Sequence, residues 1–227
     1  MLKVLDSAVP VACWSCSVAH NESTLFCPDC SKIQPPSTGD FFSVFGIERR
    51  LNLDLAALER AFHRLSRQLH PDRFVRASAS EKQWSLADTA LVNDAYRTLK
   101  DPLRRTEYLL KLEGVEMGAP ADASRALDQK TNLLEEVFEL NMQLDEMRAA
   151  KKAGQRNAEL EETLRQARKW NAGRVEAVDC QMREQWTRWD AGDAAARTAA
   201  QRELVALLDR RRFLSNLLRD VNEILKD

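Results

Sequence analysis

The stretch RLSRQLHPDRF, Arg64 to Phe74, ends one predicted helix and begins a turn. Upstream of the turn, apolar residues recur at steps of three and four, the spacing of one face of a helix: Leu55, Leu58, Phe62, Leu65 and Leu69. Pro71 ends this helix because proline lacks a backbone N–H and disfavours a helical conformation in the preceding residue. The sequence therefore predicts an amphipathic helix, capped at its start by Asn52 or Asp54, with a histidine, a proline and an aspartate in the loop at its end.

A second long helix is predicted to begin near Ser80, after this loop. Its apolar face is formed by Trp84, Ala87, Leu91, Ala95 and Leu99. It ends before Asp101-Pro102, where a further helix begins and runs to Gly114. The segment DFFSVFGI, residues 40–47, supplies a short apolar turn that can brace the open end of the two long helices. The predicted unit is an antiparallel helical hairpin with His70-Pro71-Asp72 at its tip.

The exposed side of the first helix carries a stripe of cations, formed by Arg60, Arg64 and Arg67, with His63 one turn before Arg67. Charged positions on a helix usually form no more than a solvated face. In this stripe, however, no acidic residue follows Glu59. The pattern therefore favours a docking surface.

The composition favours a helical globular protein. The 227 residues suffice for two small domains with a short appendage. Hydrophobic residues make up 44% and charged residues 30%, which is a globular balance. With only seven glycines and seven prolines, strands separated by turns are not expected. The predicted fold class is all-α.

The overall charge excludes some partners. A formal net charge of -1 gives no general attraction for nucleic acid or an anionic membrane. No apolar run approaches the roughly 18 residues of a membrane span, and the first dozen residues lack the features of a secretory signal. We therefore expect a cytoplasmic protein, or one of the mitochondrial matrix if a transit peptide has been removed. In such reducing compartments paired cysteines bind metal more readily than each other.

Four cysteines form two C-x-x-C pairs near the N-terminus: Cys13, Cys16, Cys27 and Cys30. Each pair can hold one side of a tetrahedral ion, and four thiolates match one structural zinc ion. A redox dithiol is the alternative, which the absence of a strand and helix around the pairs disfavours. Because four sulfur ligands leave no open position for catalysis, we expect a structural site or a docking knob.

Three further features concern the cysteines and their surroundings. Residues 1–39 carry a net negative charge, which makes this knuckle a poor phosphate binder. The fifth cysteine, Cys180, lies in a helical stretch and is expected to be a small packed residue. A linker with Pro35-Pro36 and Gly39 follows the knuckle and marks a boundary near residue 39.

The C-terminal part of the chain is predicted to form a three-helix bundle. Helical stretches occupy residues 129–152, 155–190 and 194–226, separated by glycine-containing turns. Their core stripes are Leu133, Val137, Leu140, Leu144 and Met147, then Leu204, Leu208, Leu218, Val221 and Leu225. The tryptophans of the middle helix are expected in the core: Trp170, Trp186 and Trp189.

Two of these helices are more apolar than one core requires. The surplus side chains of the first helix are Leu134, Phe138 and Met142, and those of the last are Phe213, Leu217 and Ile224, which we place opposite Leu204. Such side chains either widen the core or await a partner. The pattern alone leaves both readings open.

Several segments of the sequence together resemble a known protein family. DFFSVFGI, LHPDRF and VNDAYRTLKDPLRRTEYLL resemble the J domain of DnaJ-type co-chaperones. HPDRF followed by EYLLKLEG resembles more closely the HscB branch, the J proteins of iron-sulfur cluster assembly. CWSC and LFCPDC look like the metal-binding extension found in mitochondrial-type and some bacterial HscB proteins. The resemblance covers residues 13 to 152 well and is weaker beyond.

The resemblance implies a function without catalysis. In the family, the histidine-proline-aspartate loop and the basic helix before it contact a DnaK/HscA-type chaperone and speed its ATP hydrolysis. The implied chaperone-binding residues are His70, Pro71, Asp72, Arg73, Arg60, Arg64 and Arg67. The segments LLEEVFELNMQLDEM and RRFLSNLL resemble those that bind the IscU-type scaffold. The implied scaffold-binding residues are Leu134, Phe138, Met142, Phe213 and Leu217.

The resulting prediction is a non-enzymatic co-chaperone of four segments. These are a zinc knuckle with its linker at 1–39, a J domain at 40–113, a linker at 114–127 and a scaffold-binding helical bundle at 128–227. A J protein with another client remains an alternative, as does a zinc-dependent interaction or nucleic-acid module with an incidental histidine-proline-aspartate turn.

Overall fold

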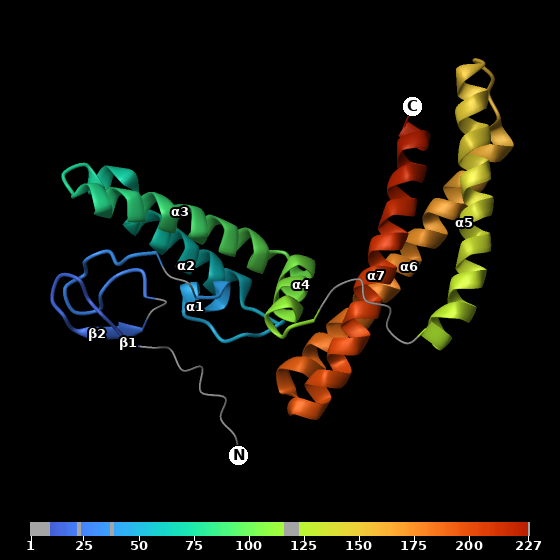
Figure 1. Cartoon of the computed structure of the whole chain (residues 1–227). Helices are drawn as coiled ribbons and strands as arrows, with labels where there is room; N and C mark the ends of the chain where they lie inside the picture. The colour runs from blue at the N-terminus through green and yellow to red at the C-terminus, as the bar shows by residue number, and fades with distance from the viewer. Residues whose placement is uncertain (1–9, 22–23, 37–38, 116–122, 227) are drawn as a thin grey trace. The chain divides into compact units, whose positions relative to one another are not determined.

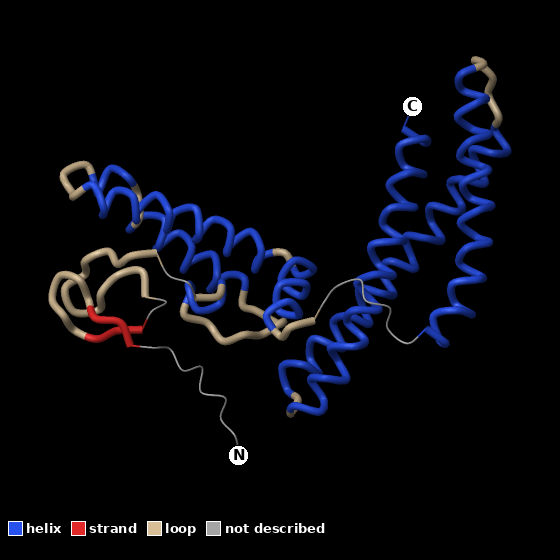
Figure 2. The backbone as a smooth tube through the Cα atoms, viewed as in Figure 1, coloured by secondary structure: helices blue, strands red, loops and turns tan. Residues whose placement is uncertain are grey.

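The computed structural model describes residues 10–21, 24–36, 39–115 and 123–226, and within the helix that begins at Ala123 it describes the side chains from Phe138 onward (Figure 1). Helices form nearly all of the regular structure, as Figure 2 shows. The two short strands, β1 (Pro10–Ala12) and β2 (Ala19–Asn21), pair antiparallel, with Val11 opposite His20. The all-α prediction is confirmed. The chain divides into two compact units, residues 1–109 and 110–227.

The centre of the first unit is a helical hairpin. Helix α2 (Leu55–Gln68) begins at Asp54, whose carboxylate accepts from the backbone N–H of Ala57 at 3.0 Å. A short 3-10 helix, η1 (Pro71–Phe74), follows, and α3 (Ala79–Lys100) returns alongside α2. Ser78 caps α3 in a reciprocal arrangement with Glu81, because each side chain accepts from the backbone N–H of the other residue.

Two shorter helices close the open end of the hairpin. Helix α1 (Phe41–Phe45) begins at Asp40 and ends at Gly46, whose φ of 65° lies in the left-handed region that glycine adopts without strain. Helix α4 (Pro102–Leu112) brings the ring of Tyr108 onto that of Phe41, with centroids 4.4 Å apart. The buried guanidinium of Arg105 on α4 donates to the backbone carbonyl groups of Leu51 and Leu99.

The buried face of α3 differs from the predicted one. The buried residues are Glu81, Ser85, Asp88, Val92, Ala95 and Leu99. Ala87 is exposed, and Trp84 and Leu91 are half-buried. Ala95 and Leu99 are buried as predicted. The prediction was wrong at the other three positions because α3 carries apolar residues on two adjacent arcs, and polar residues occupy positions on the arc that faces the core.

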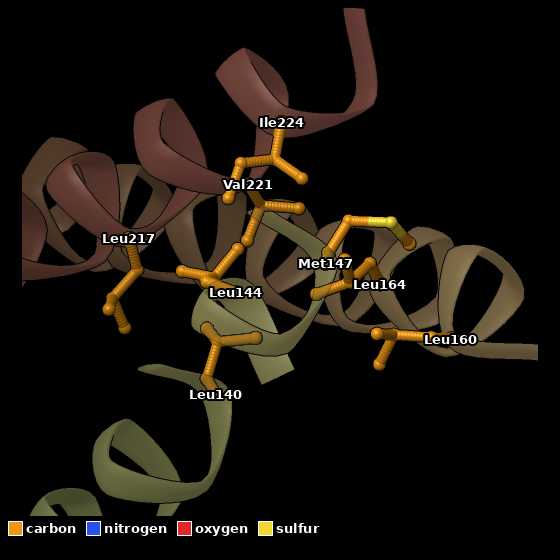
Figure 3. Close-up of a cluster of buried hydrophobic side chains, with 8 residues drawn as sticks. All are labelled: Leu140, Leu144, Met147, Leu160, Leu164, Leu217, Val221 and Ile224. Atoms are coloured by element: carbon orange, nitrogen blue, oxygen red, sulfur yellow. The ribbon is translucent and has the colours of Figure 1, made fainter. Parts of the chain in front are cut away.

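The second unit is an antiparallel bundle of α5 (Ala123–Lys152), α6 (Ala158–Ala191) and α7 (Ala194–Lys226). These bounds agree with the predicted stretches, except that α5 begins earlier and α6 later. Figure 3 shows the core cluster that the three helices share: Leu140, Leu144, Met147, Leu160, Leu164, Leu217, Val221 and Ile224. Gly192 ends α6, and any side chain there would press against the backbone oxygen of Arg188.

Several predicted positions in the bundle require correction. Leu217 and Ile224 lie in the core and not on an opposite face, because α7 packs against both α5 and α6 and therefore buries a wide arc. Trp186 and Trp189 are buried as predicted, but Trp170 is 68% exposed. Cys180 is exposed as well, so its prediction as a packed residue was wrong.

Candidate functional site

The predicted loop lies at the tip of the α2–α3 hairpin and is open to solvent. The side chains of His70 and Asp72 are 59% and 86% exposed. The Nδ1 atom of His70 accepts from the backbone N–H of Asp72 at 3.3 Å and lies 3.5 Å from the Asp72 carboxylate. Pro71 occupies the first position of η1, where its fixed φ and missing N–H suit the start of a helix. Arg73 follows on η1 and is exposed.

The ends of this loop are held by contacts to α3. Leu69 is fully buried, and the hydroxyl of Ser85 donates to its backbone carbonyl at 2.7 Å. At the other end, Ser78 is fixed by the carboxylate of Glu81. The tip is therefore solvated but tied at both ends. Sequence reasoning missed Ser85, because its bond joins residues 16 apart and depends on how α3 packs against the end of α2.

The predicted cationic stripe is exposed along α2. Arg60, His63, Arg64 and Arg67 all lie on its solvent side. Two of them have weak acidic neighbours. The guanidinium of Arg60 lies 4.0 Å from the Asp54 carboxylate, and the imidazole of His63 lies 3.9 Å from that of Glu59. Surface pairs of this kind contribute little to stability. The stripe leads along α2 toward the loop.

The four predicted cysteines converge in the knuckle. All four sulfur atoms lie within 4.8 Å of one another, and the Cys13–Cys30 and Cys16–Cys27 distances are both 3.6 Å. A tetrahedral ion with metal–sulfur distances of about 2.3 Å requires sulfur–sulfur separations of about 3.8 Å. The four side chains therefore fit one tetrahedral metal ion.

The surroundings act in opposite directions on Cys13 and Cys16. Burial acts to raise the pKa of Cys13, but the backbone N–H groups of Cys16 and Ser15 and the neighbouring thiols outweigh it, so the pKa falls to about 6. At Cys16 a backbone hydrogen bond from Val18 lowers the pKa, but burial and the neighbouring thiols outweigh it and raise the pKa to about 12. The side chain of Gln34 also lies within hydrogen-bonding distance of the Cys13 sulfur, at 3.4 Å, and within 3.0 Å of the His20 imidazole. His20 therefore contacts a neighbour of the cysteines, Gln34, and is not one of the four metal-ligand candidates.

The predicted scaffold-binding residues divide into three groups. Phe138 and Met142 on α5 are 67% and 59% exposed. Phe213 is partly buried against the bundle core, and Leu217 is a member of it. Leu134 lies outside the described side chains. The structure thus presents an exposed apolar face on α5 and does not extend it to Leu217.

Within the part of the chain that the structure describes, none of the helices has both the length and the apolar character needed to cross a membrane.

Comparison with known proteins gives a family match for part of the first unit and relatives that cover most of the chain. The DnaJ domain family matches residues 40–108, which include the hairpin and its tip. A co-chaperone protein HscB homolog from Azoarcus sp. (strain BH72) is 34% identical over 188 residues, covering 82% of this chain and 94% of that protein. The chain belongs to the HscB family. Its J-domain hairpin and its cysteine knuckle agree with that assignment.

Other HscB proteins resemble parts or all of the chain. The human iron-sulfur cluster co-chaperone protein HscB is 39% identical over 138 residues, and this alignment covers 59% of the chain and 57% of the human protein. The chain thus spans a little over half the length of the mammalian relatives it matches. By structure, it aligns with human HscB at a TM-score of 0.60 and 29% identity, over 93% of this chain and 97% of the human one.

Proposed function

We propose that this HscB protein is a co-chaperone that stimulates the ATPase of a DnaK/HscA-type chaperone and delivers an IscU-type iron-sulfur scaffold to it. The observation that carries the proposal is the solvated loop of His70, Pro71 and Asp72, tied at both ends and continuous with an exposed stripe of cations. Its relatives are named co-chaperones, and the four cysteines of the knuckle would supply all four ligands of a tetrahedral ion.

The loop suits recognition of a charged partner. The carboxylate of Asp72 is exposed and is able to accept paired hydrogen bonds from a guanidinium group of the chaperone. Pro71 restricts the backbone before it, and the imidazole of His70 orients the backbone N–H of Asp72. Arg64 and Arg67 on α2 provide cations for an acidic surface of the same partner.

The second unit offers a separate surface for the scaffold. Phe138 and Met142 follow each other at one helical turn on α5, on the side away from Leu140 and Leu144 in the core. Exposed large apolar side chains at this spacing are suited to an apolar groove or helix of a partner. We propose that this face of α5 is the scaffold-binding surface.

The knuckle fits structural zinc. Cys13, Cys16, Cys27 and Cys30 would hold the ion with four thiolates, which joins the two C-x-x-C pairs. Bound zinc would stabilise the fold of the knuckle and would supply no reaction chemistry, because four thiolates complete its coordination. A metal-bound set of cysteines also suits the reducing compartment that the sequence predicts.

The central test is ATP hydrolysis by the chaperone in a single turnover. The Asp72→Asn variant should lose stimulation while its helicity and melting temperature remain those of the wild type, because the side chain is 86% exposed. Asp94→Asn, an exposed aspartate on α3, is the matched control and should stimulate normally. Equal stimulation by Asp72→Asn and the wild type would refute the proposed coupling.

A further inference from the structure

Two side-chain contacts join the knuckle to the first two turns of α3, and both lie within the first compact unit. The indole rings of Trp14 and Trp84 meet edge to face, with centroids 5.8 Å apart and planes at 63°. The ammonium group of Lys32 lies 3.4 Å from the carboxylate of Glu81, which is 10% exposed. These two contacts join the metal knuckle to the helix that follows the His70-Pro71-Asp72 loop.

Both contacts depend on the two halves of the knuckle staying together. Trp14 lies between Cys13 and Cys16, yet its indole N–H donates to the backbone carbonyl of Ile33 at 2.7 Å, beyond the second cysteine pair. Lys32 lies two residues after Cys30. A tetrahedral ion held by the four cysteines would join the two pairs, and would thereby keep the Trp14 ring and the Lys32 side chain in position against α3.

Glu81 and Ser85, which directly follows Trp84, hold the two ends of the loop. One carboxylate oxygen of Glu81 meets Lys32, while the other accepts from the backbone N–H and the hydroxyl of Ser78, at 2.9 and 2.8 Å. Trp84 is followed directly by Ser85, whose hydroxyl donates to the carbonyl of Leu69 at 2.7 Å. The knuckle therefore contacts α3 at Glu81, which anchors the loop after Ala77, and at Trp84, which is adjacent to the anchor before His70, Ser85.

We propose that the knuckle is a metal-dependent brace for the loop that carries His70, Pro71 and Asp72. With metal bound, Trp14 and Lys32 restrain the first turns of α3, and the loop opens less often. When metal is lost, both contacts are released and the loop anchors become more mobile. The consequence for chaperone coupling rests on the proposed function, whereas the brace is a property of this chain alone.

Hydrogen exchange of the full-length chain tests the brace without a chaperone. Backbone amides of residues 69–85 are measured with one equivalent of zinc and after chelation. In the wild type, zinc should slow their exchange by about two- to tenfold, the range expected for an aromatic pair that forms only in the closed state. Trp84→Ala and Lys32→Ala should each reduce this zinc effect.

Matched controls lie on the same helix. Leu86 is 62% exposed and Lys82 is exposed, so Leu86→Ala and Lys82→Ala should retain the full zinc effect. The brace is refuted if zinc leaves the exchange of residues 69–85 unchanged in the wild type, or if Trp84→Ala responds to zinc as Leu86→Ala does. Either result leaves the ATPase test of Asp72→Asn untouched, and failure of that test leaves the exchange result untouched.

Discussion

Asp88 is a buried carboxylate in the middle of the J-domain hairpin, and we predict that it makes the hairpin less stable as pH rises. Its side chain is fully buried, and neither carboxylate oxygen has a hydrogen-bond partner among the described residues. Ser85, one turn away, donates to the carbonyl of Leu69 instead. Burial therefore raises the pKa of Asp88 from 3.8 to about 7.

The sign and size of the effect follow from proton linkage. Between pH 3.8 and about 7 the folded hairpin holds a proton on Asp88 that the unfolded chain has released. The free energy of unfolding therefore falls as pH rises through this window, by about 1.4 kcal/mol per pH unit. Above pH 7 the accumulated loss is on the order of 4 kcal/mol. The stabilisation is fully present below pH 3.8 and absent once Asp88 ionises.

Asp88→Asn removes the titration and keeps the shape of the side chain. The buried amide costs about 1 to 3 kcal/mol of stability at every pH if it finds no partner. The test therefore compares how the opening free energy changes with pH, and not its absolute value. Native-state hydrogen exchange at Val92 and Ala95, corrected for the intrinsic rate at each pH, reports opening of the hairpin. Unfolding of the whole chain is less suitable because two units contribute.

The expected result is a falling opening free energy between pH 4.5 and 7.5 in the wild type and a flatter profile in Asp88→Asn. Asp94→Asn, which removes an exposed carboxylate on the same helix, should keep the wild-type slope. Parallel profiles for the wild type and Asp88→Asn would show that Asp88 is hydrated or paired in solution, and the reasoning from burial would then be wrong.

The remaining predictions concern the metal site, the cationic stripe on α2, the exposed face of α5 and the core of the bundle. Metal analysis of the loaded protein should give one zinc ion per chain, and Cys13→Ser should reduce it while the melting of the helical units persists. Arg64→Ala with Arg67→Ala should weaken chaperone stimulation more at low than at high salt, because exposed charges are screened. Phe138→Ala should weaken scaffold binding, measured by calorimetric titration, by ~1 to 3 kcal/mol with little change in melting. Leu217→Ala should instead cost ~2 to 5 kcal/mol of folding stability, measured by denaturant unfolding of the bundle, because its side chain is in the core. A large loss of stability in Phe138→Ala would show that the Phe138 ring is buried in the core and does not form the scaffold-binding surface.

Local signals predicted much of this protein from sequence. Asp54 caps α2 and Pro71 follows its end, as expected, because capping and the missing proline N–H act within a few residues. The C-x-x-C spacing placed the four cysteines around one point, since each pair folds as a local turn. The helix bounds of the bundle followed from glycine-containing turns and from a period of 3.6 residues.

Tertiary packing decided what no local pattern contains. Leu217 and Phe138 both lie off the predicted stripes, yet one is buried and the other exposed, because α7 packs against two helices while the outer face of α5 meets none that the structure describes. The contact of Trp14 with Trp84 joins residues far apart in the chain, and Asp88 is buried only because α3 turns its polar positions toward the core. Periodicity identifies the arcs of a helix, but the neighbours that cover each arc determine which are buried.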